Sequence, residues 1–248
     1  MRVSSKPSSG IWITPGGGSL SGPAFRKRVR PNGGSMRLFV TGTKGQVVSA
    51  LIERGRQTTA DIIALGRPNI DLTDPTSLRE AIFPMAPDAI VSAAAFTAVD
   101  LAEDETREAF AANASGAGHL AHVARRLDVP IIHLSTDYVF DGRNPAGYRE
   151  DDPVGPINAY GKSKLAGEYF VQANTLNHAI LRTSWVYSPF GANFLKTMLR
   201  FAEERDVLSV VDDQRGAPTS AFDIADGILA IAANMLERPK EKALRGTF

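Results

Sequence analysis

The chain has 248 residues, of which 43% are hydrophobic and 22% are charged, a balance that suits a globular domain with a buried core. It has no cysteine, which excludes disulfides and thiolate metal sites and is usual in the cytoplasm. The longest apolar runs are far shorter than the roughly 20 residues that a membrane-spanning helix needs. Because the four histidines also form no HExxH pattern, we expect a cytoplasmic protein with no membrane span and no metal site.

The formal net charge of +1 hides an uneven distribution. Residues 1–35 hold six Lys or Arg and no acidic residue, and 18 of these 35 positions are Gly, Ser or Pro. We interpret them as a disordered leader, with a transit peptide as the alternative. From Met36 onward, acidic residues outnumber basic ones by five. This argues against nucleic acid as the main partner, because phosphate binding draws on a basic surface.

Strand and helix patterns alternate from Met36 onward. Short apolar, β-branched runs without polar alternation are typical of a parallel sheet that helices cover on both faces. We therefore expect an α/β fold with a doubly wound parallel sheet, Rossmann-like, and a small C-terminal substrate lobe. In chain order, the expected strands are residues 37–42, 61–65, 89–95, 129–136, 178–184 and 208–211, and the expected helices are residues 45–54, 76–83, 106–127, 159–172, 193–204 and 221–236.

The first predicted strand ends in a glycine turn, with Gly42 and Gly45 three residues apart before a helix. Backbone N–H groups and the helix N-terminus of such a turn bind a dinucleotide pyrophosphate. Lys44 and Gln46 belong to the same turn and are further candidate cofactor residues. Val48 stands where the third glycine of the fingerprint is expected, so a tight turn without a ligand stays open as the alternative.

The second predicted strand leads to Arg67, where an NAD-binding fold places an acidic residue for the ribose 2′-hydroxyl. An arginine there can bind the 2′-phosphate of NADP, and Lys44 is placed to assist. We therefore expect NADPH as the cofactor and leave NADH open; a solvated loop residue is the alternative interpretation of Arg67. Asp71 and Leu72, slightly further along, are expected to border the adenine.

The sharpest signal is the pair Tyr160 and Lys164, which opens a predicted helix and lies on one helical face. At this spacing a lysine ammonium can stabilise a tyrosine phenolate and lower the tyrosine pKa from about 10 toward neutral pH. Thr136 ends the preceding strand, at the sheet edge where such folds bind ligands. The pattern predicts that Tyr160 donates a proton to a substrate oxygen that Thr136 also holds.

Seven segments stand out in chain order, namely TGTKGQ, AAAFTAVDLAE, NASGAGHLA, STDYVFDG, YGKSKLAGE, LRTSWVYSP and DDQRGAPTS. Together they resemble the dTDP-4-dehydrorhamnose reductases of the extended short-chain dehydrogenase/reductase superfamily. The resemblance extends from about Met36 to Phe248 without large gaps. The glycine turn and the Tyr-x-x-x-Lys pattern mark only the superfamily, whereas the second, sixth and seventh segments mark the family.

The resemblance implies NADPH-dependent reduction of the C4 keto group of a nucleotide-linked 4-keto-6-deoxysugar, dTDP-4-dehydro-L-rhamnose giving dTDP-L-rhamnose. Thr136, Tyr160 and Lys164 match the family's catalytic residues, and the same three are expected to touch substrate or cofactor. The resemblance also places Asn113 near the lysine. It implies that three small residues pass beside the nicotinamide ribose and that three others contact the sugar, namely Ala93, Ala94 and Ala95 for the cofactor and Thr97, Asp100 and Trp185 for the substrate.

Two other functions stay open. One is a sugar epimerase or dehydratase of the same superfamily, although dehydratases carry an acidic pair after the threonine and here Tyr138 follows Asp137. The other is a non-catalytic nucleotide-binding regulatory subunit resembling that of methionine adenosyltransferase. We expect residues 36–181 to form the NADP-binding domain and residues 182–248 to mix sheet edge with a truncated substrate lobe; a homodimer is left open.

Overall fold

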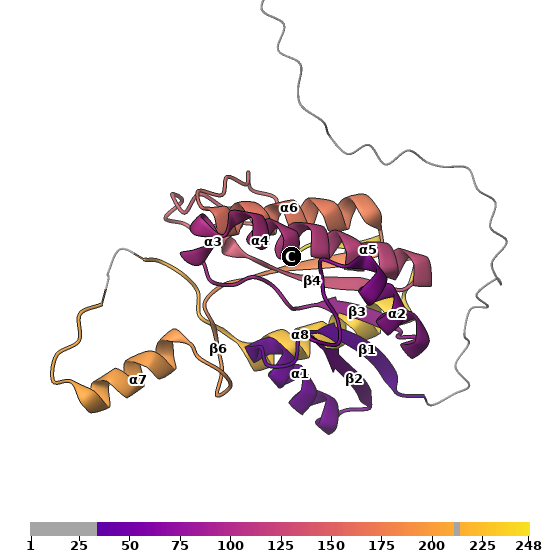
Figure 1. Cartoon of the computed structure of the whole chain (residues 1–248), viewed down its shortest axis with the longest axis horizontal. Helices are drawn as coiled ribbons and strands as arrows, with labels where there is room; N and C mark the ends of the chain where they lie inside the picture. Colours follow the sequence, from indigo (N-terminus) through magenta and orange to yellow (C-terminus); the bar gives the residue numbers. More distant parts are fainter. Residues whose placement is uncertain (1–33, 211–213) are drawn as a thin grey trace, which may run out of the picture. The chain divides into compact units, whose positions relative to one another are not determined.

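The computed structural model describes residues 34–210 and 214–248, so the expectation of a disordered leader lies almost wholly outside the described residues. Residues 33–248 form one compact unit with a central sheet between two helical layers (Figure 1). All six strands of the sheet are parallel, in the order β2-β1-β3-β4-β5-β8. The doubly wound α/β fold is confirmed, whereas the domain division at residue 181 stays a prediction. The strands are β1 (Met36–Thr41), β2 (Ala60–Leu65), β3 (Ala89–Ser92), β4 (Ile131–Thr136), β5 (His178–Thr183) and β8 (Gly246–Thr247).

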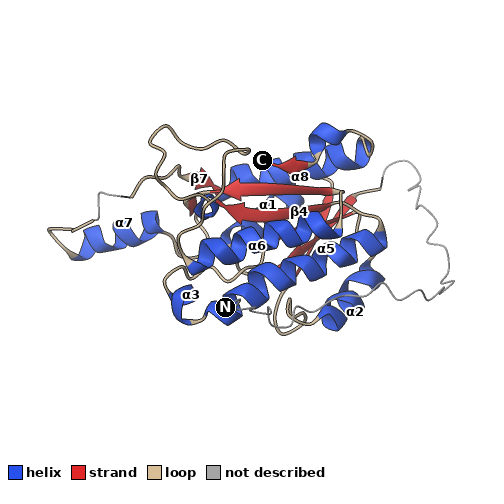
Figure 2. Ribbon diagram, turned by 90° about the horizontal axis from the view of Figure 1, so that it is seen from above, coloured by secondary structure: helices blue, strands red, loops and turns tan. Residues whose placement is uncertain are grey.

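Helices cover both faces of this sheet (Figure 2). On one face lie α1 (Gln46–Gln57) and α8 (Ala221–Glu237), which pack against each other. On the other face lie α2 (Pro75–Met85), α5 (Gly116–Leu127) and α6 (Ala159–Asn174), and two short helices, α3 (Leu101–Asp104) and α4 (Thr106–Phe110), precede α5. None of the helices within the described ranges has the length and apolar character that crossing a bilayer requires.

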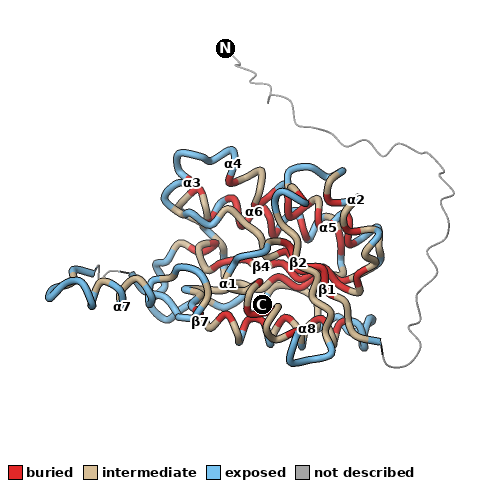
Figure 3. The backbone as a smooth tube through the Cα atoms, turned by 60° about the horizontal axis from the view of Figure 1, so that its bottom comes forward, coloured by how far each residue is buried: buried red, intermediate tan, exposed pale blue. Residues whose placement is uncertain are grey.

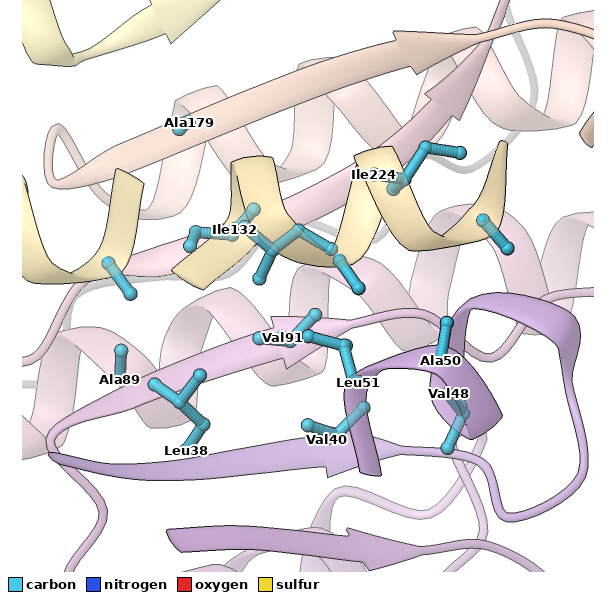
Figure 4. Packing of buried hydrophobic residues seen from close by; sticks show 14 of the residues in the cluster. Leu38, Val40, Val48, Ala50, Leu51, Ala89, Val91, Ile132, Ala179 and Ile224 are labelled. Atoms are coloured by element: carbon cyan, nitrogen blue, oxygen red, sulfur yellow. The ribbon is translucent and has the colours of Figure 1, made fainter. Parts of the chain in front are cut away.

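Alternation along the strands divides the buried side chains between the two faces, since successive residues of a strand point to opposite sides. Leu38 and Val40 pack with Leu51 of α1 and with α8, whereas Phe39 between them packs with α2 and α5. Figure 4 shows the first of these clusters. Buried residues follow the strands and the inner faces of the helices (Figure 3). Full burial of each large apolar side chain stabilises the fold by roughly 1.5–3 kcal/mol.

The order of the strands reverses beside β1, because the chain runs outward from β1 to β2 and then returns to β3 on the other side. Ligands of such folds bind at the carboxyl ends of the strands at this switch point. Gly42 turns the chain there with a φ of 97°, a left-handed value that favours glycine. A Cβ at Gly42 would lie 3.5 Å from the Cβ of Ala94. The loops after β1 and β3 therefore approach each other closely.

The long helix expected at residues 106–127 is interrupted by a π-helical turn, η1 (Ala111–Ser115). Asn113 of this turn is buried, and its Oδ1 accepts a hydrogen bond from the Phe96 N–H at 2.8 Å while its Nδ2 donates to the Phe96 carbonyl at 3.0 Å. The bonds join the helix to the loop after β3. Apolar spacing does not reveal a single wide turn, so the sequence predicted an uninterrupted helix.

Two predicted strands differ from the structure. The strand expected at residues 89–95 ends at Ser92, because Thr41 Oγ1 accepts hydrogen bonds from the N–H groups of Ala93 and Ala94, each at 2.9 Å, in place of further sheet pairing. The strand expected at residues 208–211 is wrong for residues 208–210, which have no strand structure, and the last position lies outside the described residues. Its β-branched residues have no partner strand to pair with in the part of the chain that is described.

The last residues add an edge strand to the main sheet. Gly246 and Thr247 pair with β5, and the Phe248 N–H donates to the Ile180 carbonyl at 2.8 Å while the Phe248 carbonyl accepts from the Arg182 N–H at 2.8 Å. A separate pair of short parallel strands, β6 (Val186–Tyr187) and β7 (Thr219–Ser220), flanks α7 (Phe194–Glu204) in the sequence.

Candidate active site

The three residues predicted to be catalytic converge at the carboxyl end of β4. Thr136 is the last residue of this strand and is 6% exposed. Tyr160 and Lys164 lie one turn apart on α6, and Lys164 is 4% exposed. The Thr136 hydroxyl donates a hydrogen bond to Asp137 Oδ1 at 3.1 Å and accepts one from the Tyr138 N–H at 3.2 Å, and it lies close enough to the Tyr160 phenol to affect the pKa of that group. This arrangement places two hydroxyl groups where one substrate oxygen could contact both.

The first turn of α6 is held by a cap and by a close backbone approach. Asn158 precedes the helix, and its Oδ1 accepts a hydrogen bond from the Gly161 N–H at 2.7 Å. A Cβ at Gly161 would lie 2.2 Å from the Tyr138 carbonyl oxygen, so only glycine fits here. Tyr138 belongs to the short helix η2 (Asp137–Val139), and its ring meets the Tyr160 ring edge-on, with centroids 5.7 Å apart. These contacts fix the position of Tyr160 relative to the end of β4.

The electrostatics of Tyr160 differ from the expectation. Burial raises the pKa of Tyr160 to about 12, the nearby Thr136 hydroxyl acts in the opposite direction, and the charge of Asp137 adds to the increase. The expected lowering of this pKa by Lys164 is therefore wrong for this structure. The Lys164 ammonium instead donates a hydrogen bond to the Leu134 carbonyl at 2.6 Å. The phenol keeps its proton at neutral pH, which is the state that a proton donor needs.

Burial also acts on Lys164, whose pKa falls to about 8, while the nearby Glu168 carboxylate opposes this decrease. Desolvation disfavours the charged form of a buried amine, which explains the direction. Lys164 is thus mostly cationic at neutral pH and loses its charge slightly above it.

The glycine turn has the backbone that a pyrophosphate needs. α1 begins after Gly45 without any capping side chain, so no side chain competes for the N–H groups at the start of this helix. Lys44 and Gly45 are exposed. A Cβ at Gly66, in the loop after β2, would lie 3.3 Å from the Cα of Gly42. The turn therefore packs tightly against the loop after β2 and is exposed to solvent at Lys44 and Gly45, an arrangement that fits a dinucleotide cofactor.

The side chain of Gln46 has other partners than a cofactor. Its Oε1 accepts hydrogen bonds from Ser188 Oγ at 2.8 Å and from Asn193 Nδ2 at 2.9 Å, and its Nε2 donates to the Val186 carbonyl at 3.1 Å. Only its backbone N–H, at the start of α1, is left for a phosphate. Gln46 thereby connects the glycine turn to the segment that leads into α7.

Arg67 and Asp71 lie together beyond β2. The Arg67 side chain is 74% exposed, and its Nη2 lies 3.1 Å from Asp71 Oδ2. Hydrogen bonds from Thr73 and then from Arg67 hold the pKa of Asp71 below its usual value. Leu72 follows, and its carbonyl oxygen is 3.0 Å from Nδ1 of His119 on α5. Arg67 is exposed enough to meet a phosphate, but Asp71 already balances part of its charge.

The loop after β3 carries the remaining predicted contacts on this side. Ala93 and Ala94 are held by Thr41, as described above, and Ala95 follows them, partly buried. Thr97 and Asp100 are exposed further along the loop. Asp100 is close enough to Tyr138 for its charge to raise the pKa of that phenol, after the larger effects of burial and of Asp137. Asp100 therefore lies on the same side of the sheet as the candidate catalytic residues.

A cavity of about 860 Å³ opens beside η2. Trp185 lines it, is 41% exposed and has a left-handed φ of 45°. The Ser184 hydroxyl donates to Asp137 Oδ2 at 2.7 Å, which ties this loop to the end of β4. A Cβ at Gly216 would lie 2.4 Å from the indole Nε1, so the backbone of Gly216 packs directly on the tryptophan. Four arginines also line the cavity, namely Arg143, Arg149, Arg182 and Arg215.

Sequence reasoning missed these arginines and the buried Glu168 that pairs with Arg182. One signal was available, since Arg182 is the only Asp, Glu, Lys or Arg in the strand predicted at residues 178–184. No comparable signal marked the loop arginines, because they come from separate segments. Within the described residues, no group of three or more His, Cys, Asp or Glu is placed to hold a metal ion.

Comparison with known proteins agrees with this geometry. Residues 36–248 match the family described as the RmlD substrate binding domain. The chain belongs to this family. Among its relatives, a dTDP-4-dehydrorhamnose reductase of Sinorhizobium fredii is 53% identical over 213 residues, which are 86% of this chain and 71% of the relative. A dTDP-4-dehydrorhamnose reductase of Burkholderia thailandensis is 44% identical over 214 residues, which are 86% of this chain and 72% of the relative.

Solved structures of the RmlD family have the same fold. The dTDP-4-dehydrorhamnose reductase of Bacillus anthracis in complex with NADP matches with a TM-score of 0.79 and 37% identity, covering 82% of this chain and 72% of that chain. The reductase from Clostridium acetobutylicum matches with a TM-score of 0.78 and 36% identity, covering 86% of this chain and 73% of that chain. The family recognised from the sequence motifs is confirmed.

Proposed function

We propose that this chain is an NADPH-dependent reductase of the C4 keto group of a nucleotide-linked 4-keto-6-deoxysugar, with dTDP-4-dehydro-L-rhamnose as substrate and dTDP-L-rhamnose as product. The observation that carries the proposal is the convergence of Thr136, Tyr160 and Lys164 beside an arginine-lined cavity, in a family whose relatives are named as this reductase. A cytoplasmic location agrees with the lack of cysteine.

The residues present fit the cofactor. The turn at Gly42 and Gly45 and the start of α1 would hold the pyrophosphate, and Arg67 would bind the 2′-phosphate. When bound, NADPH supplies the hydride for the carbonyl carbon. Lys164 and the loop at Ala94 would lie along the nicotinamide half, because this loop follows the carboxyl end of β3 and Lys164 bonds to the Leu134 carbonyl near the carboxyl end of β4.

The hydroxyl groups of Thr136 and Tyr160 bind the C4 carbonyl oxygen in this proposal. Tyr160 then transfers its proton to this oxygen as negative charge develops on it, since an alkoxide is more basic than a phenolate even when the phenol has a pKa of about 12. In this proposal the cationic Lys164, one turn away, binds the nicotinamide ribose and does not acidify Tyr160. General acid catalysis of this kind typically contributes roughly 10²–10⁴ in rate.

The cavity supplies recognition of the nucleotide sugar. Its arginines carry the charge that a diphosphate requires, and planar guanidinium groups bind phosphate oxygens in pairs. Trp185 presents an exposed aromatic face that a deoxysugar ring could pack on, since such a ring has an apolar side. Thr97 and Asp100 remain proposed contacts to the sugar.

The test is direct. Purified protein is mixed with NADPH and dTDP-4-dehydro-L-rhamnose, and the loss of nicotinamide absorbance is followed together with the mass of the product. We expect one NADPH to be oxidised for each sugar reduced, and no oxidation with a dTDP-sugar that lacks the keto group. An epimerase or dehydratase would change the sugar without net NADPH consumption, and a regulatory subunit would bind ligands without turnover; either result would contradict the proposal.

A further inference from the structure

Glu168 is a buried carboxylate that the mechanism above does not use. It lies on α6, one turn beyond Lys164, and is 1% exposed. Its Oε1 accepts hydrogen bonds from the Ser135 hydroxyl and from Arg182 Nε at 3.0 Å, and its Oε2 accepts from Arg182 Nη2 at 2.7 Å. Burying a carboxylate is unfavourable unless it is paired and hydrogen-bonded, and here both oxygens are.

Arg182, the ion-pair partner of Glu168, lies in the wall of the cavity. Its Nη1 donates a hydrogen bond to the Glu150 carbonyl at 3.0 Å, and its guanidinium lies over the Phe140 ring with Cζ 5.0 Å from the ring centroid. The side chain is 11% exposed and lines the cavity beside η2. Glu168 therefore determines where one of the four cavity arginines lies.

Ser135 connects Glu168 to the strand that carries the catalytic threonine. It directly precedes Thr136 in β4, and its carbonyl accepts a hydrogen bond from Thr183 Oγ1 at 3.2 Å. The side chain of Ser135 points to Glu168, and Thr136 is the next residue of the strand. The end of β4 is thus fixed from α6 and from β5 at once.

The charge of Glu168 also acts on Lys164, whose cationic form it favours. The other titratable groups around Lys164 contribute no negative charge. His133 of β4 is buried with a pKa far below its usual value and is neutral, Tyr160 of α6 is protonated, and Arg182 of β5 is paired with Glu168. Asn113 and Ser163, which bond to each other where η1 packs on α6, are uncharged. Glu168 is thus the anion that counteracts the desolvation of Lys164.

We propose that Glu168 is a positioning residue of the active site. Its carboxylate keeps Lys164 cationic, and its hydrogen bonds hold Ser135 at the end of β4 and the guanidinium of Arg182 in place. A buried ion pair is often no more stabilising than apolar residues of the same volume, so positioning explains the pair better than stability does. The consequence for catalysis rests on the proposed function, whereas the effect on Lys164 is a property of the protein alone.

The first experiment measures Lys164 without any substrate. The full chain is labelled with ¹³C-lysine, the Lys164 resonance is assigned with Lys164→Met, and its pKa is titrated by NMR. Glu168→Gln removes the charge and keeps the volume, and we expect the Lys164 pKa to fall by at least several tenths of a unit. Ser135→Ala removes one hydrogen bond but keeps the charge, and we expect it to leave that pKa unchanged.

Arg182→Met provides a second variant, which keeps the proposal testable if Glu168→Gln does not fold. It leaves the carboxylate with Lys164 as its cationic neighbour, so the Lys164 pKa should rise, opposite to the effect of Glu168→Gln. Unchanged Lys164 pKa values in both variants, or shifts in the same direction, would overturn the proposal.

The second experiment measures activity against pH. In Glu168→Gln, the alkaline limb of kcat/KM should move to lower pH together with the Lys164 pKa, and KM for the nucleotide sugar should increase because Arg182 is less well held. A uniform loss of activity at every pH would indicate a merely structural role and contradict the proposal. If the unaltered protein shows no turnover at all, the proposed function fails, and the NMR titration still decides the relation between Glu168 and Lys164.

Discussion

The catalytic corner, formed by the end of β4, η2 and the first three turns of α6, is held differently from the segment of residues 186–210. In the corner, Ser163 is 0% exposed, Lys164 4% and Glu168 1%, and each forms hydrogen bonds with neighbouring elements. In the segment, α7 has no buried residue, and Phe194 and Leu199 are 58% and 59% exposed. In the described structure α7 projects away from the sheet (Figure 1).

Val186 and Phe190 at the start of this segment pack on the core, but α7 itself is held mainly by polar contacts. Asn193 caps α7 and bonds to Gln46, and the Lys196 ammonium donates to the carbonyls of Pro189 and Gly191 at 2.9 and 2.8 Å. Few buried apolar contacts and exposed hydrogen bonds are features of regions that open locally at low cost. The proposed catalytic residues therefore lie in a buried, hydrogen-bonded part of the protein, whereas the position of α7 depends mainly on a few hydrogen bonds.

The largest effect should come from the corner itself. Tyr160→Phe removes only the proton-donating hydroxyl and keeps the ring that packs on Tyr138, so turnover should fall by roughly 10²–10⁴ while NADPH affinity stays nearly unchanged. Turnover is followed by nicotinamide absorbance and affinity by fluorescence. Tyr169→Phe, on the exposed face of the same helix, is the control and should retain full activity. A Tyr160→Phe protein that keeps its turnover would falsify the assignment.

The second-largest effect should be on the free energy of unfolding, because burial of the charged Lys164 destabilises the corner. Its pKa is lowered from 10.5 to about 8, so between these values the folded protein binds fewer protons than the unfolded chain and stability rises with pH. Tyr160, raised from 10 to about 12, acts in the opposite direction above pH 10, because the folded protein then retains a proton that the unfolded chain loses. The increase in the free energy of unfolding should therefore be clearest between about pH 8 and pH 10.

Lys164→Met removes this titration. The variant should be inactive, yet its free energy of unfolding at neutral pH should increase by up to about 3 kcal/mol, because the buried charge is gone. Urea unfolding across this pH range measures both effects, with Lys162→Met on the exposed side of α6 as the control. A pH-dependent rise that persists in Lys164→Met would show that another group causes it.

A smaller and local effect is expected where Gln46 holds the segment. Gln46→Leu removes three hydrogen bonds, so amide exchange in α7 should become roughly tenfold faster, about 1.4 kcal/mol of local stability, while exchange in β1 and β4 stays the same. Gln57→Leu, at the other end of α1, should leave α7 unaffected. Equal acceleration throughout the sheet would mean that the segment is not held separately from the corner.

The smallest effect should come from the most exposed of these residues. Arg67→Ala should reduce the preference for NADPH over NADH by about fivefold, near 1 kcal/mol, because an exposed charge pair is weakened by solvent and salt. Titration of both cofactors at low and high salt measures the preference, with Arg56→Ala as the control for loss of charge. If the ratio does not change, Arg67 does not contact the 2′-phosphate.

The elements that the sequence predicted well are those defined by local patterns. The strand at residues 37–42 and the helix at residues 193–204 each differ from the structure by about one residue at an end. The strand at residues 208–211 failed because β-branched residues form a strand only beside a partner, and the described chain supplies none there. The place of Gly246 and Thr247 at the edge of the main sheet likewise depends on a distant partner, β5.

Local patterns predicted the α/β alternation, the glycine turn and the spacing of Tyr160 and Lys164, because periodicity and short motifs act through neighbours in the chain. The raised pKa of Tyr160 could not be predicted in this way, because it depends on burial by distant elements. The same holds for Gln46, whose side-chain partners lie 140 or more residues further along the chain. The burial and pairing of polar groups depend on which distant segments meet in space. Local sequence patterns do not show these contacts.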